Sequence, residues 1–383
     1  MFASADLTKP PQGYYESAWH FASAAFPDPT QFSRHYVKFD FPDTVFHREP
    51  VRLEPELHWA FQWAMQSKPL PQFVAVIPGG RLAGTSGPAI LTHGAVISPD
   101  NKLIWDVSFE FHANPLLHTI FRRPQLPPPV YLPGSIAVLT STATGNYYHW
   151  MFDTLAKIDL LRRSGIAVDK YLINRQGFLP FQYATLSVVG IPPHQLMECD
   201  LTTHVQAERL VVPSLPGYSG HPPKWACDFL RHELLTKRGI SPIGGYERIY
   251  ISRGDRGMRI IVNERELVNV LSGYGFRIVK PERHSVYEQA QIFSSAQVVV
   301  APHGAGLTNL VFCRPGTKVL EILSPQYVNP VYYILSNQMG LHYAYLLGEG
   351  PRPSPQEYRH VFNANITVNV LAFRALLEKV LGV

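Results

Sequence analysis

The fold of this chain is predicted first from the stretch QVVVAPHGAGLTN, residues 297–309, whose turn consists of His303, Gly304, Ala305 and Gly306. The order of an apolar run, a glycine-bearing turn and a second apolar run is typical of a β-strand followed by a helix. Glycines let the backbone approach a ligand without a Cβ, and a helix start offers unpaired N–H groups and a positive dipole end. Such a turn is suited to bind a phosphate or diphosphate. The alternative is a tight strand–helix connection that buries its histidine.

The composition indicates a packed globular protein that does not need a nucleic-acid partner. A chain of 383 residues is long enough for two or three domains, and 46% of its residues are hydrophobic. The net charge is +5, only 16% of residues are charged, and no long run of Lys or Arg is present. Binding of nucleic acid is therefore not indicated, whereas an anionic substrate or a membrane surface fits the mild positive charge.

Cysteine use and the N-terminal sequence predict a cytoplasmic protein. Cys199, Cys227 and Cys313 lie far apart and form no metal-binding or redox spacing, which suits a reducing cytosol. Residues 1–15 contain no secretory signal, and no apolar run approaches the ~18–20 residues of a membrane span. Peripheral association with the inner face of a membrane is left open.

Strand and helix patterns alternate along most of the chain. Short β-like runs with glycine turns over residues 73–111 predict a small antiparallel element, and strands alternate with helices from residue 136 onwards. The alternation restarts after Gly244 and Gly245, so we expect an α/β protein with two Rossmann-like domains and parallel sheets. The expected domains are residues 1–240 with the β-rich extension, residues 241–350, and residues 351–383, whose final helix packs back towards the first domain.

The expected elements follow from these patterns. The expected strands are residues 73–77, 89–92, 95–97, 103–106, 136–139, 171–173, 210–212, 248–252, 276–279, 298–301 and 318–322. The expected helices run from residue 148 to Gly165, over 181–189 and 223–237, after the cap Asn263, after the capping box of Ser285 and Glu288, and over 307–312 and 370–381.

Two polar groups follow strands of the second array. Ligands of open α/β sheets bind beyond the carboxyl ends of the strands. Arg253 follows the strand 248–252, and its guanidinium can bind two phosphate oxygens. Glu321 lies at another strand end, where its carboxylate could accept hydrogen bonds from ribose hydroxyls. A solvated basic loop and a structural glutamate are the alternatives, but with residues 303–306 these groups predict a site for a diphosphate and a ribose.

A second candidate site lies at the start of the helix after residue 146. His149 and Asp153 are four residues apart and share one helix face. A histidine at a helix N-terminus is kept neutral and can accept a proton, so we favour His149 as a general base. Asp153 would orient it, or be the base itself. Tyr148 and Trp150 could offer apolar faces to a sugar ring, although an aromatic core turn with a satisfied histidine is the alternative.

With these motifs assembled, the chain resembles glycosyltransferase family 61 from about Gly87 to the C-terminus. The resemblance implies a GT-B fold, in which two Rossmann-like domains face each other and the C-terminal one holds most of the nucleotide sugar. The motifs that carry it are Asn146-Tyr147-Tyr148-His149 with Asp153, Ile251-Ser252-Arg253 with Arg259 and Asn263-Glu264, His303-Gly304-Ala305-Gly306, and Leu320-Glu321.

The resemblance also implies roles for these residues. Arg253, Arg259 and the backbone of residues 303–306 would bind the diphosphate, and Glu321 the ribose. His149 or Asp153 would act as the base, and Asn146, Tyr148 and Trp150 would lie on the acceptor side. Among family members the chain looks like a bacterial cytosolic form of the kind that builds capsules or surface polysaccharides.

We therefore expect an inverting glycosyltransferase that moves a sugar from a nucleoside-diphosphate sugar, first of all a UDP-sugar, to a hydroxyl of a glycan. No cofactor and no metal are expected, because no Asp-x-Asp triplet is present to anchor a divalent ion. A GT-B-fold nucleotide-sugar epimerase or hydrolase and a non-catalytic nucleotide- or polysaccharide-binding protein are the alternatives. The oligomeric state is left open.

Overall fold

The chain divides into two compact α/β units that do not coincide with the expected domains. A computed structural model describes residues 6–42, 48–66, 68–86, 92–108, 110, 114–175, 179–254, 257–359 and 361–383. The first unit comprises Met1–Pro42 and Leu70–Tyr218, and the second comprises Asp43–Pro69 and Ser219–Val383. The expected strand at residues 89–92 lies almost wholly outside the described residues.

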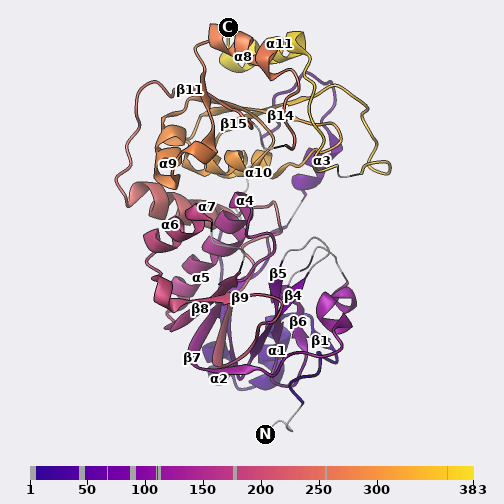
Figure 1. The fold of residues 1–383 in the computed structure, drawn as a ribbon, viewed down its shortest axis with the longest axis vertical. Coiled ribbons are helices and arrows are strands. Elements are labelled where there is room, and N and C mark those ends of the chain that lie inside the picture. The colour runs from indigo at the N-terminus through magenta and orange to yellow at the C-terminus, as the bar shows by residue number, and fades with distance from the viewer. Residues whose placement is uncertain are drawn as a thin grey trace. The chain divides into compact units, whose positions relative to one another are not determined.

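Within the described residues, the first unit contains one mixed sheet of ten strands (Figure 1). The strand order is β1-β6-β5-β4-β10-β7-β8-β9, with β3 paired to both β10 and β2. The strands are β1 Tyr14–Tyr15, β2 Tyr36–Phe39, β3 Gln72–Pro78, β4 Arg81–Ser86, β5 Thr92–Ile97, β6 Leu103–Ile104, β7 Val130–Val138, β8 Lys170–Asn174, β9 Leu196–Cys199 and β10 His204–Pro213.

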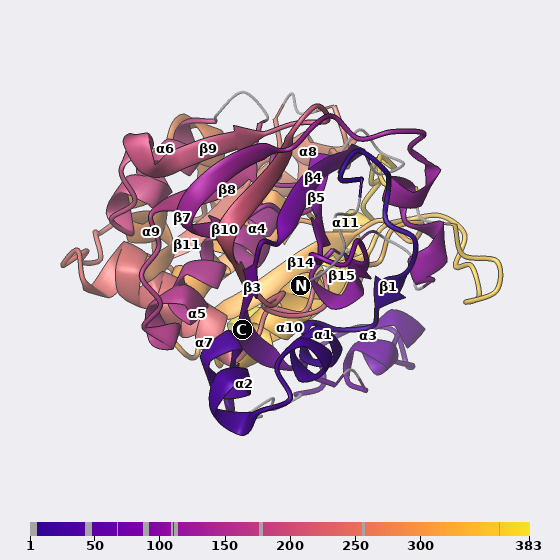
Figure 2. The ribbon, with the colours of Figure 1, turned by 90° about the horizontal axis from the view of Figure 1, so that it is seen from below.

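Strand β10 joins the antiparallel and parallel parts of this sheet. It pairs parallel to β7 on one side and antiparallel to β3 and β4 on the other, and β7, β8 and β10 run beside one another in Figure 2. The expected antiparallel element is therefore not separate from the expected parallel sheet. Pairing between residues that are far apart in sequence decides this arrangement, and no local pattern reports it.

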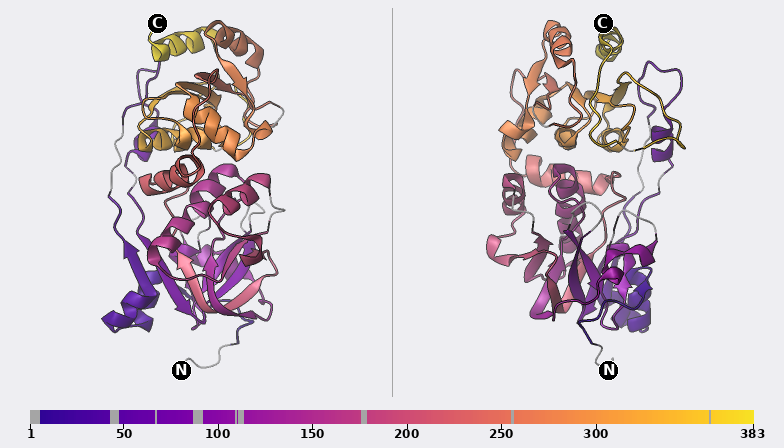
Figure 3. Two further views of the ribbon diagram at one scale, coloured as in Figure 1. Left: turned by 90° about the vertical axis from the view of Figure 1, so that its left-hand side faces the viewer. Right: turned by 45° about the vertical axis from the view of Figure 1, so that its right-hand side comes forward.

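The helices of the first unit pack on its sheet, and α1 contributes to its larger hydrophobic core. They are α1 Ala18–Ala25, α2 Pro29–His35, α4 Tyr147–His149, α5 Lys157–Ser164 and α6 Pro180–Val188. Helices α1 and α2 contact β3, and both are drawn in indigo in Figure 3. Helix α5 contacts β3 and β10. Buried side chains from β3, β7 and β10 pack with Phe21 and Ala22 of α1, and this apolar contact holds the N-terminal segment on the sheet.

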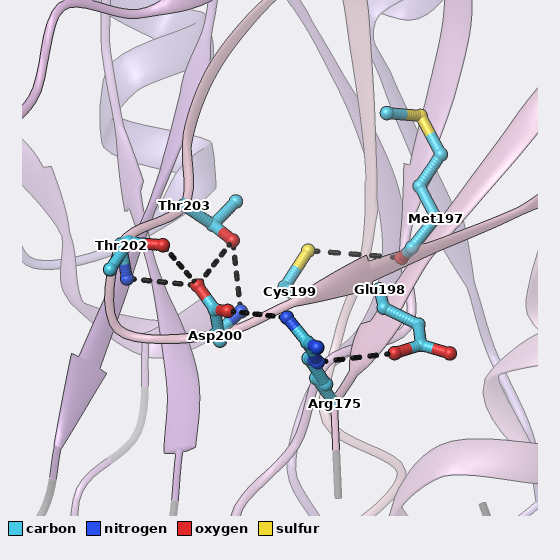
Figure 4. A network of polar contacts seen from close by, with 7 residues as sticks. All are labelled: Arg175, Met197, Glu198, Cys199, Asp200, Thr202 and Thr203. Carbon is cyan, nitrogen blue, oxygen red and sulfur yellow. Dashed lines mark hydrogen bonds and ion pairs between the residues drawn. The ribbon is translucent and has the colours of Figure 1, made fainter. Parts of the chain in front are cut away.

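The turn between β9 and β10 is held by Asp200 (Figure 4). Its Oδ1 accepts hydrogen bonds from the backbone N–H of Thr202 at 2.9 Å and from the Thr202 hydroxyl at 2.7 Å, and its Oδ2 accepts one from Arg175 at 3.2 Å. These bonds, the Thr202 hydroxyl first, lower the pKa of Asp200 to about 2. A Cβ at Gly84 of β4 would lie 1.7 Å from the Asp200 carbonyl oxygen, so this turn requires a glycine on the neighbouring strand.

The helix expected from residue 148 to Gly165 is present, but it contains an expanded turn. Helix α4 continues into a π-helical turn, Trp150–Leu155, and then into α5. Gly165 ends it with a φ of 67°, which is the left-handed conformation predicted for a helix end. Turns of the π type are uncommon and occur most often at functional sites.

The second unit contains a five-stranded sheet in which every described pairing is parallel. The order is β12-β11-β13-β14-β15. Its strands are β11 Arg248–Ile251, β12 Arg277–Val279, β13 Val298–Pro302, β14 Lys318–Leu323 and β15 His342–Leu347. Its helices are α3 Trp59–Ala64, α7 Lys224–Arg231, α8 Glu264–Gly273, α9 Val286–Ser295, α10 Val331–Gln338 and α11 Val370–Leu381.

The two faces of this sheet carry different helices. Helices α8 and α11 lie on one face and α9 and α10 on the other (Figure 1). Phe373 and Leu377 of α11 join the core formed by Leu267 of α8 and by Val300 and Leu320 of the sheet. The final helix thus packs within the second unit, whereas the sequence placed it against the first domain. Its apolar face matches the sheet edge at β14 and β15, which it contacts.

Of the two helix starts predicted from capping residues in the second unit, one has the expected cap. Ser285 and Glu288 form the expected capping box at the start of α9. Asn263 occupies the position before α8, but its side chain bonds the backbone of Val368 instead of the helix. No helix in the described parts of the chain is long and apolar enough to cross a membrane.

Candidate active site

The strand order of the second unit contains a topological switch point. From β11 the chain goes to β12 at the edge of the sheet and then crosses back to β13 on the other side of β11, so the strand order reverses between β11 and β13. In open parallel sheets of this order, ligands bind at such a switch point, beyond the carboxyl ends of the strands. Arg253 follows β11, and residues 303–306 follow β13. Two segments that the sequence singled out separately therefore meet at the switch point.

Two arginines converge on one backbone carbonyl at this point. Arg253 Nη1 donates to the carbonyl oxygen of His303 at 3.1 Å, and Arg259 Nε donates to the same oxygen at 3.3 Å. Arg253 Nε also donates to the Met258 carbonyl at 2.8 Å. These backbone carbonyls accept hydrogen bonds from the two guanidinium groups and so orient them at the switch point.

Glycine at position 304 allows the close approach of Arg253. A Cβ built on Gly304 would lie 1.7 Å from Arg253 Nη1, which is far inside van der Waals contact. The φ of Gly304 is 171°, an extended value open to any residue, so the preference for glycine comes from space and not from backbone conformation. Gly304 therefore serves to bring a guanidinium against the turn.

Arg259 adopts an unusual backbone conformation at the same site. Its φ is 51°, in the left-handed region that non-glycine residues rarely occupy. Its guanidinium lies over the ring of Tyr327 at 5.1 Å from the centroid. Among the described residues, no carboxylate forms an ion pair with Arg259. A strained residue that holds a cation at a strand end is typical of a functional site.

The helix after the glycine turn is a 3₁₀ helix, Ala305–Phe312, and not an α-helix. Its residues from Leu307 to Phe312 are buried. The apolar sequence that predicted a helix start therefore also fills the core, and its tight winding brings the turn close to β11. A Cβ at Gly306 would lie 3.4 Å from Ile251 and 3.3 Å from Pro281.

The structure gives Glu321 surroundings that do not suit the predicted contact with ribose. Its side chain is 0% exposed, and its oxygens are bonded to His303 Nδ1 at 2.6 Å and to the hydroxyl of Tyr343. The sequence placed it at a strand end, whereas β14 continues to Leu323. Leu320 and Ile322 pack in the core with α8 and α11, so Glu321 between them faces the other side of the sheet, where it is buried and bonded to His303.

In the first unit, His149 and Asp153 form the expected pair. His149 Nδ1 lies 2.7 Å from Asp153 Oδ2, and the two side chains are 20% and 17% exposed. Asn146 caps this helix by accepting a hydrogen bond from the backbone N–H of Tyr148 at 2.9 Å. A partly exposed imidazole that is oriented by a carboxylate is the arrangement of a general base.

The aromatic residues beside this pair belong to the core. Trp150 and Tyr148 are buried, and Trp150 Nε1 donates to the hydroxyl of Thr185 at 2.8 Å. The possible acceptor role of Tyr148 and Trp150 therefore has no support in this geometry, and the alternative of an aromatic core turn describes them. Of the three residues in the acceptor-side group, Asn146 is exposed.

Lys157 is a buried cation that the sequence prediction missed. It is 3% exposed, and its ammonium donates to the Thr140 carbonyl and to the Ser141 hydroxyl, both at 2.8 Å. Burial lowers the pKa of Lys157 to about 8, an effect that the charge of Asp153 opposes. The spacing of His149, Asp153 and Lys157 at intervals of four residues could have revealed it.

Among the residues that the structure describes, no group of three His, Cys, Asp or Glu side chains is arranged to hold a metal ion. Metal independence stays a prediction. At the switch point, Arg253, Arg259, His303 and the backbone of the glycine turn have the chemistry to bind an anion.

Comparisons with known proteins show similarity to one protein family and to two plant enzymes. Residues 147–320 match the family described as Glycosyltransferase 61. The beta-1,2-xylosyltransferase RCN11 of Oryza sativa subsp. japonica is 28% identical over 130 residues, which cover 30% of this chain and 24% of that protein. A beta-1,2-xylosyltransferase of Arabidopsis thaliana is 34% identical over 59 residues, 15% of this chain and 11% of that protein.

Residues 147–320 of this chain are thus similar to the glycosyltransferase 61 family, and shorter segments are similar to two plant xylosyltransferases. The matches span about a quarter or less of the relatives' length. Both relatives come from plants, so the bacterial and capsular origin stays a prediction.

A Gly304→Ala variant tests the close approach of Arg253. The new methyl group displaces a flexible guanidinium, so we expect the fold to persist while affinity for a nucleoside diphosphate falls at least ~10-fold, the worth of a charge-assisted contact. Calorimetric titration with UDP and a thermal melt measure the two effects. Gly273→Ala is the control, since nothing lies within 4 Å of its Cβ. Equal affinity in both variants would contradict the role of Gly304.

A Lys157→Met variant tests the burial of the ammonium group. The folded state disfavours the charged form, so the wild type gains stability relative to this variant as pH rises from about 8 to the ordinary lysine value of 10.5. The gain is on the order of 3 kcal/mol at most. Denaturant titrations between pH 7 and 10 measure it, with Lys170→Met, an exposed lysine of the same unit, as the control. Parallel stability curves for the wild type and Lys157→Met would refute the assignment.

Proposed function

We propose that this protein is an inverting glycosyltransferase that uses a nucleoside-diphosphate sugar as donor and a hydroxyl group of a glycan as acceptor. The observation that carries the proposal is the convergence of Arg253 and Arg259 on the carbonyl of His303 at the switch point of a parallel sheet. The family match adds support. The GT-B arrangement that the resemblance implies stays a prediction.

The proposed donor site stabilises the leaving group. As the bond between the sugar and the nucleoside diphosphate breaks, negative charge develops on the diphosphate. Fixed guanidinium groups stabilise this charge without reorganising, because backbone carbonyls already hold them in place. The arginines would thus supply the positive charge that a metal ion supplies in other enzymes.

The proposed base is His149. Because its Nδ1 faces Asp153, the hydrogen on that nitrogen is donated to the carboxylate and Nε2 is left to accept a proton. The acceptor hydroxyl loses its proton to Nε2 while its oxygen attacks the anomeric carbon, and the nucleoside diphosphate leaves from the opposite side. Asp153 then stabilises the imidazolium that forms. This tautomer favours His149 over Asp153 as the base.

The donor is proposed to be a UDP-sugar, and the relatives' names make xylose the first sugar to test. Release of UDP is measured for a panel of UDP-sugars with and without a glycan acceptor. A transferase releases UDP in proportion to glycosylated acceptor. A hydrolase or epimerase consumes the donor without an acceptor. A non-catalytic binding protein binds UDP but releases no UDP from the UDP-sugars. Either of the last two results would overturn the proposal.

The variant Arg253→Ala tests the leaving-group site. We expect kcat to fall by ~10²–10³ while the fold is kept, because one preorganised charge contact is lost in the transition state. Steady-state kinetics with the best donor and circular dichroism measure the two effects. Arg248→Ala at the amino end of the same strand is the control, and its kcat should be unchanged. A normal rate in Arg253→Ala would count against the site.

The variants His149→Ala and Asp153→Asn separate the base from its orienting partner. We expect His149→Ala to lower kcat by ~10²–10⁴ and to remove the acidic limb of the pH–rate profile, since general-base catalysis is lost. Asp153→Asn should lower kcat yet keep an acidic limb. His194→Ala, an exposed histidine of the same unit, is the control. An acidic limb that survives in His149→Ala but disappears in Asp153→Asn would make Asp153 the base.

A further inference from the structure

Lys157 is a buried cation that no step of the proposed reaction uses. The residue is 3% exposed, and its ammonium group donates to the Thr140 carbonyl and to the Ser141 hydroxyl, both at 2.8 Å. Neither partner carries a negative charge, and an ammonium group is expensive to bury among neutral partners. A lysine at this position of helix α5 therefore needs an explanation beyond packing.

Ser141 connects this ammonium group to the backbone of Asp153. An ammonium group has only donors, so the Ser141 hydroxyl accepts from Lys157 and has its single hydrogen left to donate. That hydrogen goes to the Asp153 carbonyl, and the two oxygens are 2.8 Å apart. Lys157, Ser141 and the Asp153 carbonyl therefore form one directed chain of hydrogen bonds.

The sheet of the first unit fixes Ser141 in place. Ser141 lies shortly after strand β7, and its backbone N–H donates to Asn174 Oδ1 at 2.9 Å. Asn174 is the last residue of β8, which pairs parallel to β7. Ser141 is thus held at the carboxyl ends of two neighbouring strands, and the helix carbonyl that it bonds is tied to the sheet.

The carbonyl that receives this bond belongs to the expanded turn of the helix. Asp153 lies within the π-helical turn Trp150–Leu155, where the Ala156 N–H bonds the Met151 carbonyl, five residues earlier, at 3.2 Å. A side chain that bonds into the backbone ladder is a known cause of an irregular helical turn. The direction of the Asp153 side chain depends on this turn, and its Oδ2 lies 2.7 Å from His149 Nδ1.

We propose that Lys157 and Ser141 are positioning residues that hold the expanded turn so that the Asp153 side chain stays against the His149 ring. They act through the Asp153 backbone and need no contact with donor or acceptor. Their loss slows the chemical step but leaves nucleotide binding unchanged, because the proposed nucleotide site around Arg253 belongs to the second unit. The proposal rests on the proposed function, since it concerns the orientation of the proposed base.

The variant Ser141→Ala removes the link without adding volume. We expect kcat to fall ~10–100-fold while UDP affinity stays as in the wild type, because displacing a catalytic group by ~1 Å can cost ~10²-fold in rate. Ser141→Thr keeps a hydroxyl and should restore most of the rate. Steady-state kinetics with the best donor and calorimetric titration with UDP measure the two quantities.

Lys157→Met and a matched control complete the series. Lys157→Met should lower kcat as Ser141→Ala does, and the double variant should be no slower than the slower single variant, since both residues belong to one chain of bonds. Ser164→Ala is the control, because the Ser164 hydroxyl donates to the Leu161 carbonyl at 2.7 Å in the same helix, outside this chain. Its kcat should equal that of the wild type.

Crystal structures of the wild type and Ser141→Ala measure the positioning itself, whatever the activity. The distance between His149 Nδ1 and Asp153 Oδ2 should exceed hydrogen-bond range in the variant. An unchanged distance, a normal kcat in Ser141→Ala, or a fall in kcat that only matches a loss of folded protein would overturn the inference. If Ser141→Ala does not fold, Lys157→Met carries both measurements, with Lys170→Met as its control.

His149→Ala separates this inference from the proposed base. If His149→Ala loses activity while Ser141→Ala and Lys157→Met keep the wild-type kcat, the inference alone is wrong. If His149→Ala keeps the wild-type kcat, the proposed base is wrong, and the inference falls with it.

Discussion

The contact between the Arg253 guanidinium and the backbone at Gly304 is the constraint on which the site in the second unit depends. A side chain of any other size at position 304 would occupy the space that Nη1 fills. The contact needs β11 and β13 to be neighbours, since one strand supplies the arginine and the other the turn. Sheet order, the glycine and the cation are therefore parts of a single arrangement.

The buried charged groups of the two units, Glu321 and Lys157, have different kinds of hydrogen-bond partner. Glu321 is bonded to a histidine and a tyrosine, and both bonds direct His303. Lys157 is bonded to a carbonyl and a hydroxyl, which accept two of its three hydrogens but supply no opposite charge. Buried ionised groups cost stability. Glu321 is bonded to His303, and Lys157 follows Asp153 by four residues, so both lie beside groups with proposed chemical roles, which indicates that the cost serves those roles.

Local sequence patterns predicted much of the second unit because its elements are short-range features. The capping box at Ser285, the strand before Pro302 and the final helix all follow from residues within one or two turns of each other. The positions of Arg253 and the glycine turn at adjacent strand ends could also be predicted, since the carboxyl ends of parallel strands share one edge.

Other features could not be predicted, because they depend on contacts between distant residues. Glu321 was assigned to a strand end, but it lies inside β14, and its side chain is buried. The sequence around Trp150 does not tell whether its side chain contacts a sugar or bonds to Thr185. Strand β10 joins antiparallel and parallel strands, and its antiparallel partners lie more than a hundred residues away in sequence. Residues 48–66 belong to the second unit although they precede most of the first.

The register of the parallel sheet explains why His303 and Glu321 act together. Ala301 of β13 is paired with Glu321 of β14. His303 follows Ala301 by two residues, just past the end of β13, so it lies on the same face of the sheet as Ala301 and Glu321. The backbone N–H of His303 continues the ladder by donating to Ile322 at 2.9 Å. The histidine is therefore fixed at its backbone by the sheet and at its ring by the glutamate. Because the turn is fixed at both points, the His303 carbonyl can accept hydrogen bonds from two arginines without moving, which a free loop could not do.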